Sequence, residues 1–390
     1  MTTPRRRTLR LRRPLRRAIE RGHPWIYDRA LGAVDATAGE VVAIADDRGP
    51  FATAFVDPDR PLRARVLALD PELAVDRAWA AERARLAASH RRLPPELAAT
   101  DAVRAIHGEN DGLPGLTIDV YAGVAVVVFD GGAAAAFWRP RLDAVLDGVR
   151  AGGLAITGRW LRPTRGDGGG GSGDDVPALV PIHEGPARFA VDVRHGQKTG
   201  FFLDQRANRA RVGALCGGAS VLNLCAYTGG FSVWAGLGGA RQVTSVDLAP
   251  RAIAQAEAHW RDNGLPPAAH AGETADVFAF LDRAVAARRR WDVVIADPPS
   301  FAPSEAARPR ALAAYGRLAA GALAATAPGG LLVLASCSSH VHDADLRELL
   351  ATAAGRRPLQ VVETRGAAAD HPTCPGFPEG RYLDLLICAA

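Results

Sequence analysis

The sequence predicts an α/β protein whose C-terminal half is a doubly wound, mostly parallel sheet, preceded by a small β-barrel and a central α+β segment. Two patterns predict this. From Ser220 onward, short apolar strands alternate with helices, as in a parallel sheet covered on both faces. Residues 20–68 instead show short apolar stretches between turn residues, which is typical of β structure. Because 390 residues are many for one core, we expect three parts, at residues 1–70, 73–178 and 180–390.

The C-terminal part supplies the clearest secondary-structure pattern. Parallel strands need helical crossovers, and each apolar run here is followed by a helical stretch. The expected strands are Val221–Leu224, Val243–Val246, a short one near Ala269–Ala271, Val293–Ala296, Leu331–Ala335, Gln360–Glu363 and Tyr382–Cys388. The expected helices are Phe231–Leu237, Pro250–Asn263, Asp276–Arg288, Arg310–Ala325 and Asp343–Ala353.

The central part combines helices with a hairpin. We expect helices at Asp76–His90 and Arg139–Arg150, and hairpin strands at Thr117–Tyr121 and Val124–Phe129. Asn110–Gly115 has the residues of a tight turn. Residues 165–175 are rich in glycine, which predicts a flexible loop that serves as a linker or an insertion.

Positive charge is concentrated at the N-terminus. Residues 1–70 contain 14 Arg and nine acids, a balance of +5 that equals the net charge of the whole chain. Eight of these arginines fall within the first 17 residues, before the first acid at Glu20. Such a basic arm neutralises phosphates and releases counterions, so it favours nucleic-acid binding over a merely solvated terminus. Lys198 is the single lysine of the chain, and we expect it to have a specific role.

Several classes of protein are disfavoured. No apolar run approaches the ~18–20 residues that span a bilayer, and no apolar stretch follows the Arg clusters, so a secretory signal is not expected. The five cysteines are odd in number and form no CxxC pair, which argues against a disulfide framework and against a zinc site. We expect a cytoplasmic protein with reduced thiols and no metal.

A candidate cofactor loop follows the first strand of the C-terminal sheet. The strand runs into Asn223–Ser232, where Gly229 and Gly230 allow the backbone to approach a nucleotide closely. The pattern is not GxGxxG, which disfavours a dinucleotide site and therefore an NAD-dependent oxidoreductase.

Two acids after later strands are candidates for contacts with a nucleoside. Asp247 ends the second strand, where a carboxylate accepts hydrogen bonds from ribose hydroxyls. Asp276 follows the third strand, at a position that suits an adenine amine. An Asp at a strand end is often a helix cap instead. For Asp276 the sequence supports a capping role and a cofactor-binding role equally, whereas for Asp247 it favours cofactor binding.

The fourth and fifth strands are followed by residues that could take part in catalysis. Asp297-Pro298-Pro299-Ser300-Phe301 follows the fourth strand, and its prolines stiffen a surface for a substrate base. Cys337 follows the fifth strand. Since these strands should be neighbours, about 4.8 Å apart, Cys337 is expected near Asp297. A thiolate that attacks C6 of a pyrimidine activates C5 for methylation, and a base then removes the C5 proton. The alternative interpretation is that Cys337 is a buried structural cysteine, as expected for Cys225 and Cys388. His340 and His342 could assist the thiolate, but we interpret them as exposed residues at the start of a helix.

Long motifs resemble a known family. Arg194–Arg206, Tyr227–Phe231, Asp297–Phe301, Ser336–Ser338 and Phe377–Tyr382 are similar to motifs of the 23S ribosomal RNA (cytosine-5) methyltransferases. These enzymes have a class I, Rossmann-like domain that binds S-adenosyl-L-methionine (SAM). Arg21–Trp25 resembles the start of their PUA RNA-binding domain, and Asn110–Gly115 resembles their central α+β domain. The resemblance covers nearly the whole chain.

The resemblance implies roles for individual residues. Cys337 would be the nucleophile and Asp297 would orient the base or transfer a proton. Phe202, Gln205 and Arg206 would close the SAM pocket, whose lining is implied to be Asn223, Ala226, Tyr227, Thr228, Gly229, Gly230, Asp247, Leu248, Asp276 and Asp297. One departure matters, because some relatives carry a second Cys where Ser300 stands here. The group that assists product release is therefore open.

The sequence leads to one expected function with alternatives. We expect methylation of C5 of a cytosine in 23S ribosomal RNA or its precursor particle. A homodimer is a further expected partner state. The alternatives are N-methylation of a guanine and a non-catalytic RNA-binding assembly factor. The expected RNA contacts are Arg5, Arg6, Arg7, Arg12, Arg13, Arg21, His23, Trp25 and Lys198.

Overall fold

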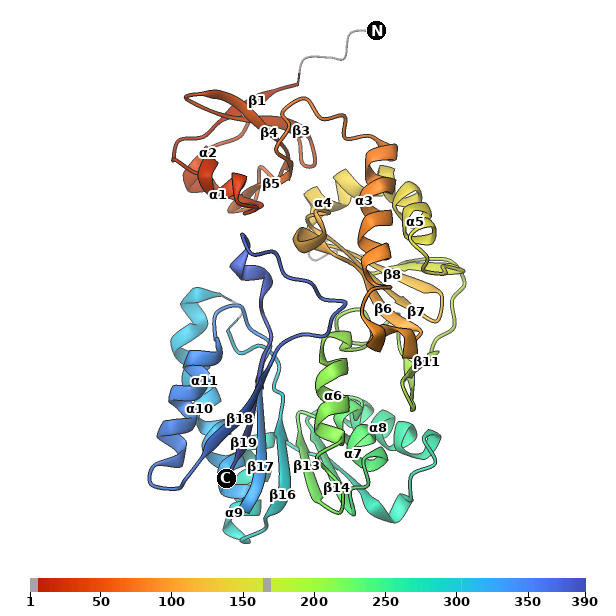
Figure 1. The fold of residues 1–390 in the computed structure, drawn as a ribbon, viewed down its shortest axis with the longest axis vertical. Coiled ribbons are helices and arrows are strands. Elements are labelled where there is room, and N and C mark those ends of the chain that lie inside the picture. The colour runs from red at the N-terminus through yellow and green to blue at the C-terminus, as the bar shows by residue number, and fades with distance from the viewer. Residues whose placement is uncertain (1–5, 164–169, 303) are drawn as a thin grey trace. The chain divides into compact units, whose positions relative to one another are not determined.

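The computed structural model describes residues 6–163, 170–302 and 304–390 and is drawn in Figure 1. The chain forms two compact units, each assembled from separate stretches. Unit 1 comprises the chain up to Ile182 together with Ala190–Leu203 and Ala369–Gly380. Unit 2 comprises His183–Phe189, Asp204–Ala368 and Arg381–Ala390. The three domain boundaries expected from the sequence cut the chain differently and stay predictions.

The N-terminal part of unit 1 is a five-stranded sheet of order β1-β3-β4-β5-β2. Its strands are mostly antiparallel, but β1 runs parallel to β3. Apolar side chains such as Ile26, Ile44 and Ala54 form its core. The elements are β1 (Thr8–Arg10), α1 (Arg16–Glu20), β2 (Trp25–Tyr27), α2 (Asp28–Leu31), β3 (Val41–Asp46), β4 (Gly49–Val56) and β5 (Leu62–Ala68).

The basic N-terminal segment is folded where the structure describes it, and its role in RNA binding stays a prediction. Thr8–Arg10 is the edge strand β1, and Leu11 is buried in the core. Arg10 lies in this strand and Arg16 and Arg17 lie in helix α1, so this segment is part of the folded sheet domain.

The central part of unit 1 is a second five-stranded sheet of order β10-β9-β8-β7-β6 covered by helices. The expected hairpin and the helix before it are present. The elements are α3 (Arg77–His90), η1 (Pro95–Ala99), β6 (Ala102–His107), η2 (Gly108–Asp111), β7 (Leu116–Tyr121), β8 (Val124–Phe129), α4 (Gly132–Trp138), η3 (Arg139–Arg141), α5 (Leu142–Ala151), β9 (Gly158–Leu161) and β10 (Ser172–Gly173).

Three details of the central part sharpen the sequence reading. Asn110–Gly115 is a turn as expected, with η2 followed by the left-handed Gly112. The single helix expected over Arg139–Arg150 is instead η3 followed by α5, and α4 was not expected. The expected flexible loop at 165–175 is described only in part: Ser172–Gly173 forms β10, whereas 165–169 lie outside the described residues.

Unit 2 is built around a seven-stranded sheet of order β15-β14-β13-β16-β17-β19-β18. The strands are parallel except β19, which is antiparallel to both neighbours. The strands are β13 (Ser220–Leu224), β14 (Gln242–Asp247), β15 (His270–Thr274), β16 (Trp291–Ala296), β17 (Thr326–Ser336), β18 (Gln360–Arg365) and β19 (Asp384–Ala389). The doubly wound sheet and the pairing of the fourth and fifth strands are confirmed.

Helices cover both faces of this sheet, as Figure 1 shows. Side chains of β16 alternate between the two sides: Val293 and Ile295 pack toward α6–α8, whereas Val294 and Ala296 pack toward α9–α11. The helices are α6 (Arg206–Gly213), α7 (Gly230–Leu237), α8 (Pro250–Asp262), α9 (Val277–Ala286), α10 (Arg308–Ala325) and α11 (Asp343–Ala354). Shorter elements are η4 (Leu203–Gln205), η5 (Pro267–Ala269), η6 (Glu305–Ala307) and η7 (Pro378–Gly380), and a hairpin of β11 (Val180–Glu184) and β12 (Ala187–Val191) precedes α6. Within the described residues, no helix is long and apolar enough to cross a membrane.

A buried ion pair fastens α6 in unit 2. Arg209 donates two hydrogen bonds to Glu184, at 2.9 and 2.5 Å, and the Trp234 indole donates a third at 2.8 Å. Both charged side chains are almost fully buried. Since a buried charge without its partner is costly, α6 and the end of β11 depend on each other.

We expect Arg209→Leu to lower the free energy of unfolding by about 3–5 kcal/mol, because Glu184 would keep a buried charge with weaker compensation. Urea denaturation measures the loss. The matched change is Arg211→Leu, on the same helix as Arg209. It removes an ion pair at the surface with Glu363 of β18, and should lower the free energy of unfolding by less than about 1 kcal/mol. Equal losses in the two variants would contradict this role.

Candidate active site

The loop between β13 and α7 has an unusual backbone. Cys225 and Tyr227 adopt positive φ angles of 55° and 47°, and Gly229 follows at 78°. A Cβ on Gly229 would lie 2.7 Å from that of Ala256 on α8. This position therefore needs glycine for both its φ angle and its close approach to α8.

Asp247 ties this loop to the neighbouring strand. Its Oδ2 accepts the Tyr227 N–H at 2.9 Å, and its Oδ1 accepts the Ala249 N–H at 2.9 Å. Each carboxylate oxygen can still accept another hydrogen bond. Leu248 beside it is 71% exposed, so an apolar side chain stands open to solvent next to the carboxylate.

Asp276 caps a helix, one of its two readings from the sequence. Its carboxylate accepts the Ala279 N–H at 3.0 Å at the start of α9, and the residue is exposed. Burial raises the pKa of the nearby Cys225 thiol, and the charges of Asp297, Asp247 and Asp276 raise it further. The loop and these three acids are therefore grouped at one edge of the sheet.

Asn223 lies at the start of a buried chain of polar groups. Its amide donates to Ser232 Oγ at 2.9 Å; Ser232 Oγ lies 2.7 Å from Ser245 Oγ, which lies 2.8 Å from His270 Nε2. Burial lowers the pKa of His270 to about 4, so the ring is neutral at pH 7 and can accept from Ser245. Of these polar side chains, only Asn223 was expected from the sequence to be a site residue.

Asp297 and Cys337 stand at the ends of adjacent parallel strands. Ala296 of β16 is in register with Leu334 of β17, and each strand then continues to its candidate residue. The Cys337 thiol donates to the Pro298 carbonyl oxygen at 3.6 Å. Both residues are partly exposed, so the expected proximity of the Cys337 thiol to the Asp297-Pro298 segment is borne out by the geometry.

The residues expected to close the pocket fall in both units. Gln205 and Arg206 belong to unit 2 and are buried, with Arg206 Nε 3.8 Å from Glu184. Gln205 Oε1 accepts from Asn208 at 2.6 Å, whereas its Nε2 has no hydrogen-bond partner among the described residues. Phe202 belongs to unit 1, where the Lys198 ammonium lies 4.3 Å from its ring centre.

A buried network in unit 1 holds the segment around Lys198. Asp119 on β7 accepts two hydrogen bonds from Arg104 and one from Thr199 Oγ1 at 2.5 Å. Tyr121 Oη lies 2.8 Å from the same Thr199 hydroxyl. Lys198 is exposed with a φ angle of 51°, so its cation is presented from a firmly anchored backbone.

His23 and Trp25, expected to contact RNA, are engaged by other parts of unit 1. Trp25 packs against Phe377 with ring centres 4.6 Å apart, and its indole donates to Glu109 at 2.9 Å. His23 Nε2 lies 3.4 Å from Glu379. Gly376 also lies close to the Arg21 carbonyl. We call Arg21, His23 and Trp25, which contact residues 376–379, the clamp on residues 374–379. The primary role visible for His23 and Trp25 is therefore structural.

The N-terminal arginines fall into two groups. Arg6, Arg7, Arg10 and Arg16 bond to carboxylates or backbone oxygens of the same sheet domain. Within the described part of the chain, no carboxylate pairs with the exposed side chains of Arg12, Arg13, Arg17, Arg21 and Arg29. Arg5 lies outside the described residues.

Sequence comparison identifies the chain. Residues 171–374 match the S-adenosylmethionine-dependent methyltransferase family, and residues 9–69 match the PUA-like domain. The chain belongs to this methyltransferase family. SAM is therefore its cofactor, as expected from the sequence.

Relatives and solved structures agree with the family. A ribosomal RNA large subunit methyltransferase of Deinococcus radiodurans is 39% identical over 389 residues, covering 95% of this chain and 94% of the relative. Ribosomal RNA large subunit methyltransferase I of Klebsiella pneumoniae is 32% identical over 382 residues, covering 95% of each. Among structures, the methyltransferase SMU.776 complexed with SAH matches with a TM-score of 0.87 at 22% identity, covering 98% of this chain and 100% of its own. This last match shows the fold alone.

The residues of unit 2 fit this cofactor. The Thr228 hydroxyl and Gln205 Nε2 are buried without a hydrogen-bond partner among the described residues. Buried polar groups are rarely left unpaired. The carboxylate and amine of SAM are groups of the type that would satisfy them.

The His270 chain predicts a pH effect on stability. His270 protonates near pH 6.5 in the unfolded state but only near pH 4 in the folded state, so the unfolded state gains protons first. Stability is full above about pH 6.5 and is lost as pH falls to 4; with allowance for the ring's partial exposure we expect about 1–2 kcal/mol. Urea midpoints across this range should fall less in His270→Gln than in the wild type. Parallel pH profiles for the two proteins would show that His270 is not responsible.

Proposed function

We propose that this chain methylates C5 of a cytosine in 23S ribosomal RNA, with Cys337 as the nucleophile. The observation that carries the proposal is the placement of a partly exposed Cys337 beside the Asp297-Pro298 segment. The relatives are named as ribosomal RNA large subunit methyltransferases, which supports this RNA as the substrate.

Other cysteines of unit 2 are poor candidates for the nucleophile. Burial raises the pKa of Cys216 to about 12 and of Cys388 to about 11, and raises that of Cys225 as well. A cysteine attacks as the thiolate, so these three thiols are strongly disfavoured. Cys337 is the remaining cysteine of unit 2.

The proposed chemistry is a covalent addition and elimination. The Cys337 thiolate adds to C6 of cytosine, and the electron pair that this moves to C5 accepts the methyl group. A base then removes the C5 proton, the C5–C6 double bond re-forms and the thiolate leaves. Asp297 is proposed to orient the base or to take part in this proton transfer, and Ser300 leaves the releasing group open.

SAM supplies the methyl group, and unit 2 would hold it at the edge of the sheet. Asp247 is proposed to accept hydrogen bonds from the ribose, and Asp276 to meet the adenine amine while it caps α9. Thr228 and Gln205 are proposed ligands of the methionine end. Asn223, Ala226, Tyr227, Gly230 and Leu248 complete the proposed lining, and Phe202 and Arg206 remain proposals for its closure.

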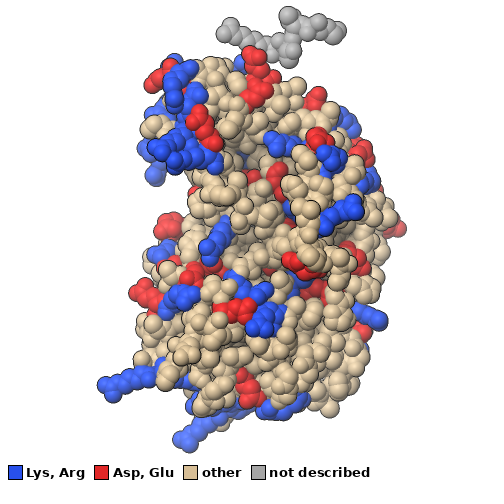
Figure 2. Space-filling view, in the orientation of Figure 1, with Lys and Arg blue, Asp and Glu red and all other residues tan. Residues whose placement is uncertain are grey.

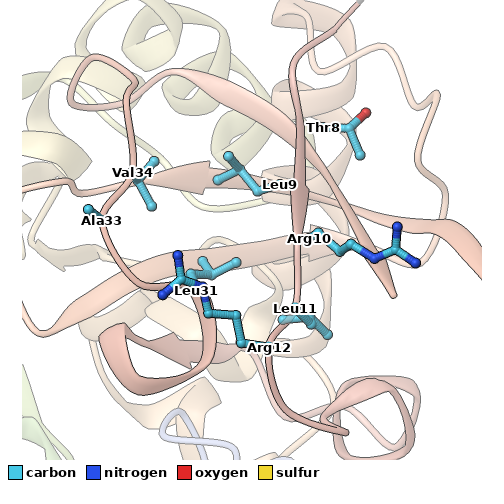
Figure 3. Close-up of a pocket in the computed structure, with 8 residues that line it drawn as sticks. All are labelled: Thr8, Leu9, Arg10, Leu11, Arg12, Leu31, Ala33 and Val34. Carbon is cyan, nitrogen blue, oxygen red and sulfur yellow. The ribbon is translucent and has the colours of Figure 1, made fainter. Parts of the chain in front are cut away.

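The RNA is proposed to bind the PUA-like domain through its unpaired arginines. Figure 2 shows Lys and Arg gathered over α1 and α2. In Figure 3 the Arg12 guanidinium lies beside Leu31, while the Arg10 guanidinium points away from Ala33 and Val34. Arg10 already pairs with Asp47 at 2.8 Å, so Arg12, Arg13, Arg17, Arg21 and Arg29 are better placed to bind phosphate. Lys198 is proposed to add a further phosphate contact.

Trapping tests the nucleophile. RNA containing 5-fluorocytidine lacks the proton that must be removed, so with SAM it should form a stable adduct on Cys337, detected by denaturing electrophoresis and peptide mass spectrometry. Cys337→Ala should form no adduct and lose methylation by at least about a thousandfold, while Cys388→Ala should keep both. Normal methylation by Cys337→Ala, or N-methylguanosine in place of 5-methylcytidine in digested RNA, would overturn the proposal.

Salt dependence tests the RNA surface. Replacing Arg12 and Arg13 by Ala should reduce the slope of log affinity against log salt by about 1.4–1.8, because each phosphate contact contributes roughly 0.7–0.9. The paired arginines Arg10 and Arg48 provide a matched double variant, which should change the slope little. The idea fails if both double variants lose the same slope.

A further inference from the structure

A cavity lies within unit 1, and its lining includes none of the residues proposed for the chemistry. It encloses about 370 Å³ among the end of α1, the end of β5, helix α3, the turn after η2 and Cys374. Ligand pockets typically have about 300–1,000 Å³. The space is therefore large enough for one small molecule or one residue of a polymer.

The walls of this cavity are partly apolar and open to solvent. Leu69 after β5 is 53% exposed and Leu86 on α3 is 38% exposed, and both line it. Large aliphatic side chains held open in a concavity offer a surface on which the flat face of a base can pack. His23 and His90 add ring edges to the same lining.

One arginine of the lining has no carboxylate partner among the described residues and can contact an anion. The carboxylates of the lining are in ion pairs: Glu109 pairs with Arg65, Asp111 with Arg91 and Glu20 with Arg16, and Arg65 and Arg16 also pair with Asp130 and Asp46. Arg83 on α3 also lines the cavity, and none of the described carboxylates pairs with it. Arg21, exposed, stands between the lining residues Glu20 and Gly22. Arg83 is thus the arginine of the lining that is left for an anion to contact.

We propose that this cavity binds one unstacked nucleotide of the RNA substrate, with the base against Leu69 and Leu86 and its phosphate on Arg83. Single-stranded RNA is recognised by such a combination of packing on bases and cations on the backbone. The inference rests on the proposed function for the RNA but not on the role of Cys337. It makes α3 of the central part an RNA contact alongside the PUA-like domain.

Cys374 provides a probe inside the cavity, since its thiol lines the space and is half-buried. A saturating 23S RNA transcript should slow the reaction of N-ethylmaleimide with Cys374 at least about fivefold, measured by peptide mass spectrometry, while SAM alone should not. Maleimide-treated wild type should bind the transcript more weakly than treated Cys374→Ser. An unchanged rate at Cys374 while RNA binding is demonstrated by filter retention would overturn the inference. Absence of any RNA binding would instead overturn the proposed function.

A pair of variants on α3 tests the phosphate contact. Arg83→Ala should weaken binding of the transcript about fivefold to tenfold and reduce the salt slope by about one, with SAM affinity unchanged. Arg85→Ala is the matched control, because Arg85 pairs with Glu82 on the same helix and does not line the cavity. Equal effects of the two changes on RNA affinity and salt slope would contradict the proposed site.

Discussion

The common edge at which β14, β13, β16 and β17 end is the constraint on which the candidate site depends. Cys225, Asp247, Asp297 and Cys337 each stand at or just beyond the end of one of these strands. Packing fixes the register of the strands, since a slip by one residue would turn Val293 and Ile295 toward the wrong layer of helices. Asp247, Asp297 and Cys337, which are far apart in the sequence, are therefore held at one edge of the sheet by the packing of its apolar side chains.

The sequence predicted unit 2 well because its signals are local. Apolar runs bounded by glycine, proline and aspartate mark buried parallel strands, and every expected strand overlaps an observed one. The short strand β1 was not predicted, because the apolar residues Leu9 and Leu11 alternate with arginines in a segment that is mostly basic. Helix α4 was missed because its alanine run has no amphipathic period. The sequence identified Asp276 and Asp247 by their positions after strands. It could not distinguish a carboxylate that caps a helix or a loop from one that binds a ligand, because both occur at the same positions.

Contacts between distant segments were beyond local signals. Trp25 was expected to contact RNA, yet it packs on Phe377 and bonds to Glu109. Similarly, Thr199 gave no sign that Asp119 and Tyr121 would hold it. These residues are polar or aromatic in short motifs, which is as compatible with binding a ligand as with binding another part of the chain. Only the fold separates the two, because it shows what each side chain already contacts.

The clamp on residues 374–379 has a consequence for how the protein is made. Unit 1 includes Ala369–Gly380, a stretch that follows Ile182 by nearly two hundred residues of chain. At about 5–20 residues per second, the nascent N-terminal part would wait roughly 10–40 s before Phe377 could cover Trp25. During that interval, exposed aromatic and charged groups would be open to chaperones and to misfolding. Synthesis speed across unit 2 is thus a variable to which the yield of folded protein should be sensitive.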